Sequence, residues 1–311
     1  MGLENRTIVT EIILLGFSTD LKINILLFVL FLVMYVITVI GNCLIILLII
    51  INPHLQTPMY FFLCILSLLD LCNSSSVVPR LLSDLITAQR SITLGACALQ
   101  FYTILLMGGT ECLLLALMAY DRYVAICRPL HYPVLMRWSV CFRLVAFLLL
   151  ISFFLFVFPS LSSPMALCNP NLVNHYMCEL LAIIKLTCDH VYSSEVSILI
   201  LCFASILLPF VYIIVTYICI ITKVLKIKSG GRSKTFSTCT SHITVVALYF
   251  GTGMVMYFGP SSDYSTSQGK YISVFYNIVC PMLNPIIYSL NNREVKETLK
   301  KLYGSSLSTA Q

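Results

Sequence analysis

The chain has 311 residues, of which 59% are hydrophobic and only 10% are charged. Because ordinary soluble domains carry about a quarter charged residues, this composition excludes water as the solvent for most of the chain. The net charge of +6 does not indicate a nucleic-acid partner, since the basic residues are scattered between apolar runs rather than gathered in one polar domain.

The first long apolar run indicates a membrane protein. Residues 23–51 form 29 positions without a charge, which is too long for a signal-peptide core and long enough to span a bilayer with tilt. No basic leader precedes this run. We therefore expect a retained signal anchor that follows an extracellular N-terminal segment, residues 1–22.

Six more apolar runs follow, and together the seven predict an all-α, seven-transmembrane helix bundle over residues 23–290. Acids in the second and third runs, and the shortness of the sixth, leave counts of six or eight open on hydropathy alone. The predicted spans are residues 23–51, 58–78, 91–120, 144–163, 196–222, 243–260 and 271–290.

The distribution of basic residues predicts the orientation of this bundle. With the N-terminus outside, thirteen of the nineteen Lys and Arg residues lie on inner loops and the tail, as the positive-inside rule requires. Asn5, within an Asn-Arg-Thr triplet, is then an extracellular candidate for N-glycosylation. Residues 291–311 form a cytoplasmic tail, in which Val295 and Leu299 share the apolar face of a short helix on the inner membrane surface; an ordinary amphipathic tail has the same pattern.

Two acids lie deep within predicted spans, Asp70 in the second and Glu111 in the third. A charge at mid-bilayer costs several kcal/mol unless it faces the protein interior, so both side chains must point into the bundle. Helical geometry then places Ile104 and Arg122 on the same stripe as Glu111. We expect the two acids to bind a sodium ion or a proton that stabilises one of two helix arrangements; a buried hydrogen-bond network is the alternative.

The inner end of the third span carries a decapeptide, Met118 to Cys127, with the sequence MAYDRYVAIC. It closely resembles the odorant-receptor form of the aspartate-arginine-tyrosine motif. Four further segments match that family in order and spacing, namely PMYFFL at 58–63, LSLLD at 66–70, STCTSH at 237–242 and PMLNPIIYSL at 281–290. The chain is therefore similar, over nearly its whole length, to odorant receptors of the rhodopsin-like class A of G-protein-coupled receptors.

This resemblance implies a receptor that binds a small odorant within the bundle and activates a stimulatory, olfactory-type heterotrimeric G protein to raise cyclic AMP. It also implies a plasma-membrane location, in olfactory neuron cilia, with membrane lipid around the bundle and no cofactor. Asp121 would hold the Arg122 guanidinium at rest, and release would let Arg122 reach Tyr217 and the G protein. An arginine that merely snorkels to the membrane surface is the alternative. The expected coupling and switch residues are Asp121, Arg122, Tyr123, Tyr217, Phe250, Asn284, Pro285 and Tyr288.

Four cysteines fall on the predicted outer side of the membrane: Cys97, Cys168, Cys178 and Cys188. In an oxidising compartment they favour two disulfides, for which three pairings are possible, and free buried thiols are the alternative. The family resemblance implies the pairs Cys97–Cys178 and Cys168–Cys188.

The ligand is expected in the outer half of the bundle, between the third, fifth, sixth and seventh spans. The candidate residues are mostly apolar and include no charge, which favours a small, neutral, largely apolar and volatile ligand. For each apolar candidate, ordinary helix packing is the alternative. The candidates are Ile104, Leu105, Gly108, Cys202, Ser205, Ile206, Met254, Tyr257, Val274 and Asn277.

The chain departs from the family pattern at three places. Tyr249-Phe250-Gly251 stands where the family usually has Phe-Tyr-Gly, so the presumed switch position, Phe250, lacks a hydroxyl. Leu149 replaces a usual tryptophan, and Asn291 replaces the arginine of the closing Ser-Leu-Arg-Asn. These departures leave the fold unchanged and raise the question of whether signalling is weakened.

Other classes of protein find less support in the sequence. No glycine-rich phosphate loop, His-Glu-x-x-His motif or nucleophile elbow is present, so an enzyme is not expected. A small-molecule transporter would also use intramembrane acids, but it would usually have repeated halves with paired broken helices, which this sequence lacks. A receptor of the same fold for an endogenous metabolite outside the nose stays open.

Overall fold

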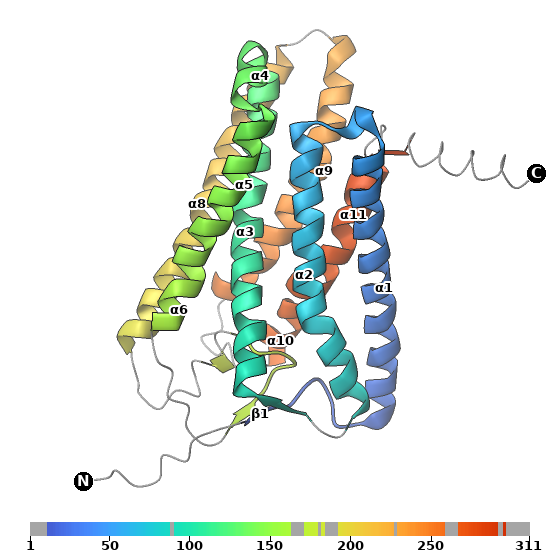
Figure 1. The fold of residues 1–311 in the computed structure, drawn as a ribbon, viewed down its shortest axis with the longest axis vertical. Coiled ribbons are helices and arrows are strands. Elements are labelled where there is room, and N and C mark those ends of the chain that lie inside the picture. Colours follow the sequence, from blue (N-terminus) through green and yellow to red (C-terminus); the bar gives the residue numbers. More distant parts are fainter. Residues whose placement is uncertain are drawn as a thin grey trace, which may run out of the picture.

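The computed structural model describes residues 11–87, 90–162, 171–179, 182–183, 192–226, 229–258, 267–291 and 295–296. Long helices lie side by side and roughly parallel to the longest axis of the molecule (Figure 1). In an apolar solvent a helix satisfies all of its interior backbone hydrogen bonds within one segment, which is why these apolar runs become helices. Val295 and Lys296 are helical, and the rest of the predicted C-terminal helix lies outside the described residues.

The secondary structure includes two π-helical turns, η3 and η4, and two 3-10 turns, η1 and η2. In chain order the elements are β1 (Glu11–Leu14), α1 (Leu21–Ile51), η1 (Pro53–Leu55), α2 (Pro58–Ile86), β2 (Ser91–Thr93), α3 (Leu94–Cys127), η2 (Pro129–His131), α4 (Tyr132–Leu135), α5 (Trp138–Ser152), η3 (Phe153–Val157), α6 (Phe158–Ser162), β3 (Leu172–Val173), α8 (Tyr192–Leu225), α9 (Ser229–Phe258), α10 (Ser267–Val274), η4 (Phe275–Val279) and α11 (Cys280–Asn291).

Seven segments of this list have the composition of membrane spans. Six helical segments of the described chain are long and apolar enough to cross a bilayer, and α9 adds a shorter apolar stretch, Cys239–Val255. The fourth span joins α5 to η3, and the seventh joins α10, η4 and α11. Helix α2 continues to Ile86 through Pro79, which a membrane helix tolerates, and residues 91–93 form strand β2 rather than the start of a helix.

Capping side chains or a proline mark the points where three of the long helices begin. The carboxylate of Asp20 accepts a hydrogen bond of 2.8 Å from the backbone N–H of Lys22 at the start of α1. Pro58 occupies the first turn of α2, where its missing N–H leaves no helix bond unmade. Thr93 caps α3, accepting from the N–H of Ala96 at 3.4 Å. The helices therefore begin outside the most apolar stretches.

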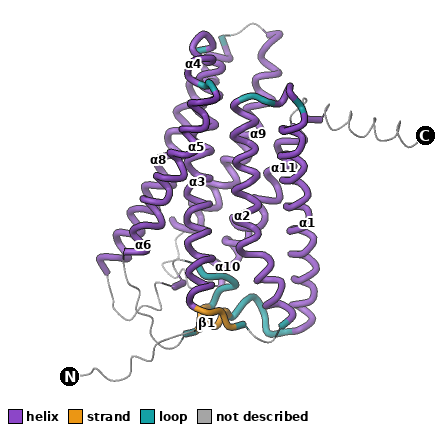
Figure 2. Tube along the Cα trace, viewed as in Figure 1, coloured by secondary structure: helices purple, strands orange, loops and turns teal. Residues whose placement is uncertain are grey.

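A small sheet covers one end of the bundle, which we call the disulfide end (Figure 2). Its strand order is β2-β1-β3, with β1 antiparallel to β2 and parallel to β3. Ile13 pairs with Ser91 of β2 and with Leu172 of β3. Segments from three distant parts of the sequence are thereby joined into one cap. The opposite end, which carries Arg122 and α4, is called the Arg122 end.

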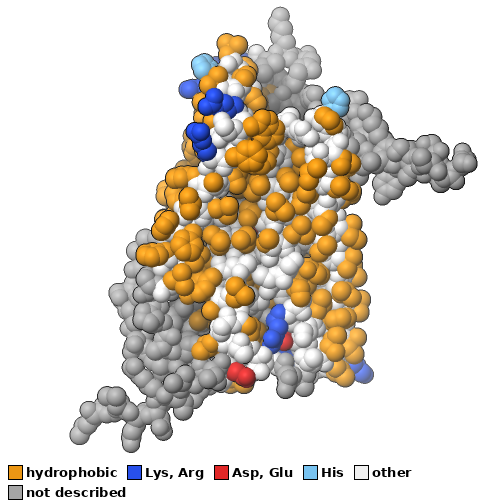
Figure 3. Space-filling model, in the orientation of Figure 1, with side chains coloured by type: hydrophobic (Ala, Val, Ile, Leu, Met, Phe, Trp, Pro, Cys, Tyr) orange, Lys and Arg blue, Asp and Glu red, His pale blue; other side chains and the backbone are white. Residues whose placement is uncertain are grey.

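The surface of the bundle is apolar between these two ends. Figure 3 shows orange side chains over the middle of the visible face, whereas the Lys, Arg and acidic side chains that this face shows lie near its two ends. Residues such as Leu26 and Ile40 of α1 are more than half exposed, with exposed fractions of 70% and 61%. A surface of this kind matches a hydrocarbon solvent rather than water.

Helix α1 packs closely against α11 where a glycine faces a proline. A Cβ atom added to Gly41 would lie 2.9 Å from Cγ and 3.2 Å from Cβ of Pro285. Both separations are shorter than ordinary carbon contacts, so any side chain at position 41 would push the two helices apart. Small residues at such crossings are how membrane helices gain close packing.

We expect Gly41→Ala to destabilise the bundle by about 1–3 kcal/mol, since it overpacks the contact with Pro285. Gly95→Ala is the matched control, because a Cβ added at Gly95 meets nothing within 4 Å. Thermal unfolding of both purified variants in detergent checks this. Equal melting temperatures for the two variants would contradict a close-packing role for Gly41.

Candidate functional site

A cavity of about 100 Å³ opens among α3, α8, α9 and η4, toward the disulfide end. Its volume is of the order of the roughly 150 Å³ apolar cavity that binds benzene in another protein. Six of the ten residues proposed from the sequence line it: Ile104, Leu105, Gly108, Ser205, Ile206 and Asn277.

The other four candidates are placed differently or lie outside the described side chains. Met254 packs against the main hydrophobic core, and Val274 packs against a cluster that contains Phe31 and Tyr176. Neither lines the cavity. The side chains of Cys202 and Tyr257 lie outside the described part of the structure, although both positions are helical.

Sequence reasoning missed several residues that line the cavity. Four of them come from loops and π-turns, whose direction the helical period does not predict: Phe156, Met177, Glu179 and Tyr276. The fifth, Tyr249, lies on the regular helix α9. Glu179 corrects the expectation that no charge borders the cavity, because it follows the disulfide cysteine and lines the cavity with its side chain 8% exposed. Its Oε2 atom accepts a hydrogen bond of 3.2 Å from the backbone N–H of Ala182.

Two adjacent glycines of α3 give two aromatic side chains room beside the cavity. A Cβ atom on Gly108 would overlap the hydroxyl of Tyr276, and one on Gly109 would overlap the ring of Phe156. Both aromatic residues stand in π-turns, Phe156 in η3 and Tyr276 in η4. The wider π-turns aim these rings at α3, and π-turns inside helices are frequent at functional sites.

A pair of tyrosine hydroxyls links three spans at this wall. Tyr249 of α9 donates a hydrogen bond of 2.6 Å to the backbone carbonyl of Gly108, and its oxygen lies 2.8 Å from the hydroxyl of Tyr276. Phe250, the neighbouring residue, is buried and packs against Phe210 of α8 with ring centroids 5.5 Å apart. The hydroxyl that position 250 lacks is therefore present one residue earlier, facing α3 and η4.

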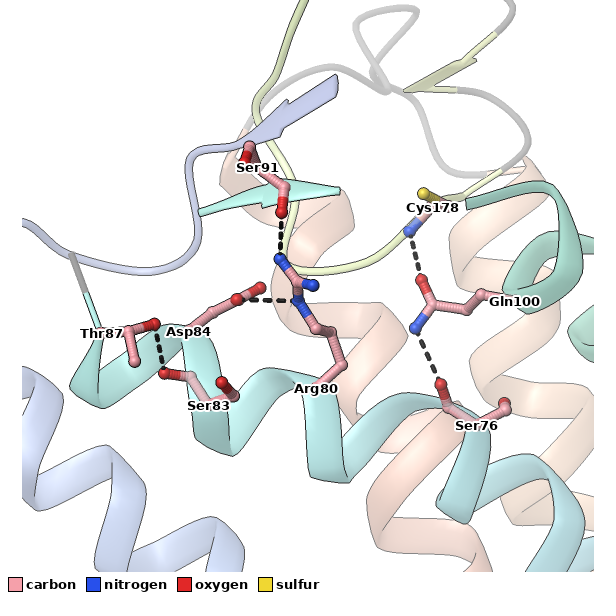
Figure 4. Close-up of polar contacts among 8 residues, drawn as sticks. All are labelled: Ser76, Arg80, Ser83, Asp84, Thr87, Ser91, Gln100 and Cys178. Carbon is pink, nitrogen blue, oxygen red and sulfur yellow. Dashed lines mark hydrogen bonds and ion pairs between the residues drawn. The ribbon is translucent and has the colours of Figure 1, made fainter. Parts of the chain in front are cut away.

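The disulfide end is held together by a covalent bond and by polar contacts, and Figure 4 shows the polar contacts. Cys97 of α3 and Cys178 form a disulfide, as the family resemblance implied. The Gln100 side chain accepts from the N–H of Cys178 at 2.9 Å and donates to the carbonyl of Ser76 at 2.8 Å. Arg80 forms an ion pair of 2.8 Å with Asp84. Asn5, Cys168 and Cys188 lie outside the described residues.

His175 is buried in the same cap and is held as a neutral imidazole. Its Nδ1 accepts from the N–H of Met177 at 3.2 Å, and its Nε2 lies 3.2 Å from the Ser273 hydroxyl. Burial first, and then the nearby Lys270 ammonium, lower the pKa of His175 to about 3. Lys270 donates to Asn174 at 2.8 Å and to the carbonyl of Gly16, so the seventh span is bound to the N-terminal segment.

The two acids lie in the interior of the bundle. Asp70 is fully buried, and the amide of Asn284 donates toward its two carboxyl oxygens at 3.1 and 3.0 Å. Glu111 is 2% exposed and interacts electrostatically with Asp70. Its Oε1 atom has no hydrogen-bond partner among the described residues. No cluster of three or more metal-ligating side chains is found in the described part of the chain, so an ion here would depend on these two carboxyls and neighbouring oxygens.

The Arg122 end differs from expectation at Asp121. No ion pair joins Asp121 to Arg122 in this described region; instead Tyr132 of α4 donates a hydrogen bond of 2.9 Å to Asp121. Asp121 is buried and Arg122 is half-buried, and Arg122 still interacts electrostatically with both Asp121 and Tyr132. The hydrogen-bond partner of Asp121 is therefore α4 rather than Arg122.

A second link at this end joins α3, α8 and α9. The Tyr217 hydroxyl lies 2.8 Å from Nδ1 of His242, whose Nε2 lies 3.1 Å from the carbonyl of Leu115. His242 is fully buried. With Nε2 protonated, His242 donates to Leu115 and accepts from Tyr217, which satisfies both ring nitrogens. Of the other expected switch residues, Tyr288 is buried near this core, Pro285 packs on α1, and Tyr123 is half-buried.

Comparisons with known proteins find olfactory receptors by sequence and a rhodopsin by structure. A sequence model described as "Olfactory receptor" matches residues 31–305. Olfactory receptor 5AR1 of Mus musculus is 45% identical over 98% of this chain and 99% of its own length. Olfactory receptor 2F1 of Homo sapiens is 47% identical over 97% of this chain and 96% of its own. The structure of squid rhodopsin, 18% identical, matches with a TM-score of 0.73 over 94% of this chain and 89% of that one, which confirms the seven-helix fold.

We expect the free energy of unfolding to decrease as the pH is lowered, because His175 must be neutral in the folded protein. Its pKa is about 3 when folded and about 6.5 when unfolded, so its contribution is complete above pH 6.5 and is lost progressively as pH falls toward 3. The loss between pH 7.5 and pH 5 should be about 2 kcal/mol. Thermal unfolding at both values checks this, with His175→Gln as the comparison. An equal pH effect in both proteins would refute it.

Proposed function

This chain belongs to the olfactory receptor family of rhodopsin-like, G-protein-coupled receptors, and we infer that its ligand is a small, neutral, largely apolar volatile molecule bound in the cavity between α3, α8, α9 and η4. It is a multi-pass plasma-membrane protein and a signalling receptor rather than an enzyme. The observation that carries the inference is the cavity itself, which is small, mainly apolar and bordered by the loop that carries Cys178 of the disulfide.

The orientation and location follow from the same proposal. The disulfide end faces outward, because disulfides persist in oxidising compartments. The Arg122 end and the tail from residue 291 face the cytoplasm, where basic residues accumulate. The tissue setting consistent with the family is the cilium of an olfactory neuron.

Signalling would begin with ligand in the cavity and end at the Arg122 end. The contact of Tyr217 and His242 with the Leu115 carbonyl ties α8 and α9 to α3 in the arrangement described above. Breaking this contact would let the inner ends of α8 and α9 separate and open a cytoplasmic cleft. Arg122 and the basic residues between 223 and 234 would then contact a stimulatory, olfactory-type G protein, which raises cyclic AMP.

The buried acids supply a proposed control of this transition. Asp70 and Glu111 would bind a sodium ion or share a proton, since two interacting carboxyls in a low-dielectric interior do not stay charged together without a cation. The Asn284 amide, from α11, holds Asp70 in place. A bound cation would thus favour the arrangement in which α2, α3 and α11 are packed together.

We expect Arg122→Ala to abolish the cyclic AMP response to an activating volatile compound at equal surface expression. The reason is that the guanidinium is the charged group available for the G protein at the centre of the cleft. The measurement is cyclic AMP in cells challenged with a broad panel of odorants and endogenous metabolites. Arg143→Ala is the matched control, because Arg143 is exposed on α5 and should leave the response unchanged.

The panel also discriminates among ligand classes. A response to volatile compounds that disappears only with Arg122→Ala supports the proposed function. A response to endogenous metabolites alone would replace the odorant by a metabolite while keeping the receptor mechanism. Equal responses from the wild type and Arg122→Ala would remove Arg122 from coupling.

Asp70→Asn should abolish any dependence of agonist potency on sodium, because a carboxamide keeps the contact with Asn284 but carries no charge to hold the ion. Agonist potency is compared in sodium and in choline buffers, for the wild type, Asp70→Asn and Glu111→Gln. Both variants should lose the sodium effect together. Persistence of that effect in either variant would exclude a shared site.

A further inference from the structure

The two tyrosine hydroxyls at the cavity wall form a chain whose hydrogens can be counted. Tyr249 uses its one hydrogen on the Gly108 carbonyl. In the 2.8 Å contact between the two hydroxyls, Tyr276 must therefore be the donor and Tyr249 the acceptor. Both hydrogens are used within the protein. The two hydroxyls therefore present only oxygen lone pairs to the cavity, unless one of these hydrogen bonds is exchanged for a bond to a ligand.

Tyr276 is the last donor in this chain of hydrogen bonds, and its hydroxyl hydrogen is easier to redirect than that of Tyr249. It lines the cavity and is only partly buried, whereas Tyr249 is 5% exposed. If Tyr276 donates to a ligand, one hydrogen bond is exchanged for another, and Tyr249 keeps its bond to Gly108. The Asn277 amide is an alternative donor, but one of its two hydrogens is bound to the Ser273 carbonyl at 3.0 Å, and the side chain is only 1% exposed.

Glu179, the charged residue that lines the cavity, does not compete with Tyr276 as a donor to an acceptor atom of the ligand. The Glu179 carboxylate accepts hydrogen bonds and offers none, so it would repel a carbonyl oxygen. A ligand with one acceptor atom therefore has a complementary donor in Tyr276; the other hydroxyl-bearing side chain that lines the cavity, Ser205, already takes part in an interaction within the protein. The rest of the cavity surface nearby, including Ile104, Leu105 and Ile206, suits a hydrocarbon body.

The order of residues 249 and 250 and the π-turn η4 together position the hydroxyls of Tyr249 and Tyr276. The Tyr249-Phe250 order turns a hydroxyl toward α3 and η4, because adjacent helix positions point about 100° apart. The π-turn η4 brings Tyr276 against Gly108, where a Cβ atom would overlap its hydroxyl. The arrangement therefore needs the glycine, the π-turn and the residue order at once.

Resting on the proposed function, we propose that Tyr276 is the specificity-determining residue of the cavity, and that it donates a hydrogen bond to a carbonyl oxygen of a small ketone, aldehyde or ester. Binding of that oxygen takes the hydrogen of Tyr276 away from Tyr249. The hydrogen bond between η4 and α9 is thereby exchanged for a bond to the ligand, and the Tyr249 hydroxyl keeps only its bond to the Gly108 carbonyl.

The two phenylalanine variants are expected to act in opposite directions. Tyr276→Phe removes the donor and should weaken the binding of carbonyl compounds by about three- to tenfold, the effect of one hydrogen bond. Tyr249→Phe removes the competing acceptor and frees the Tyr276 hydrogen, so carbonyl binding should be unchanged or stronger. A merely structural role would make both variants weaken binding of every ligand.

Binding is measured as ligand-dependent thermal stabilisation of the purified full chain in lipid nanodiscs. The probes are small ketones, aldehydes and esters, such as cyclohexanone, each paired with a hydrocarbon of equal heavy-atom number, such as methylcyclohexane. The hydrocarbons should bind all variants equally. Tyr35→Phe is the matched control, since the Tyr35 hydroxyl contacts Ser75 and does not line the cavity.

Weaker binding of carbonyl compounds to Tyr276→Phe alone supports the proposal. Equal effects on both probe classes, equal losses in both variants, or no carbonyl compound bound by the wild type would overturn it. Because the nanodisc assay contains no G protein, carbonyl binding without a cyclic AMP response in cells would count against the proposed signalling function and leave the Tyr276 site standing.

Discussion

Two carboxyl groups inside a bundle surrounded by hydrocarbon, Asp70 and Glu111, set the constraint on which the rest of the structure depends. Each is costly to bury, and lipid offers neither group a partner. The helices that carry them must therefore face each other, and α11 must supply the Asn284 amide to Asp70. The close contact of Gly41 with Pro285 then brings α1 against the same helix. The internal polar contacts thus determine which faces of these spans turn inward.

The ligand cavity lies between this polar interior and the cap at the disulfide end. Its walls depend on interruptions of regular helix: two π-turns direct Phe156 and Tyr276 toward consecutive glycines of α3. Above it, the Cys97–Cys178 disulfide and Gln100 fix the loop that contributes Met177 and Glu179. Toward the Arg122 end, the link of Tyr217 and His242 to the Leu115 carbonyl joins the spans expected to move. Helix α3 therefore contributes both to the cavity and to the Arg122 end.

Parts of the site that lie on regular helix were predictable. Ile104 and Gly108 lie seven and three residues before Glu111, on or beside its stripe in the 3.6-residue period of α3, and both line the cavity. Tyr276 was missed because a π-turn shifts the period, so that it and Asn277 both reach the cavity. Glu179 was missed because no periodicity predicts the path of a loop. The hydrogen bond from Tyr132 to Asp121 was missed because the helical period does not predict how α4 packs against α3.

The sequence by itself determined the solvent, the helical class and the family, because apolar length, charge placement and short motifs are local properties of the chain. It also determined that Asp70 and Glu111 face inward, since lipid excludes the other choice. The tertiary structure decided which groups meet: Tyr249 with Gly108 and Tyr276, and Tyr132 with Asp121. Such contacts depend on helix rotation, π-turns and loop paths, which arise from the packing of all the spans together and not from any one segment.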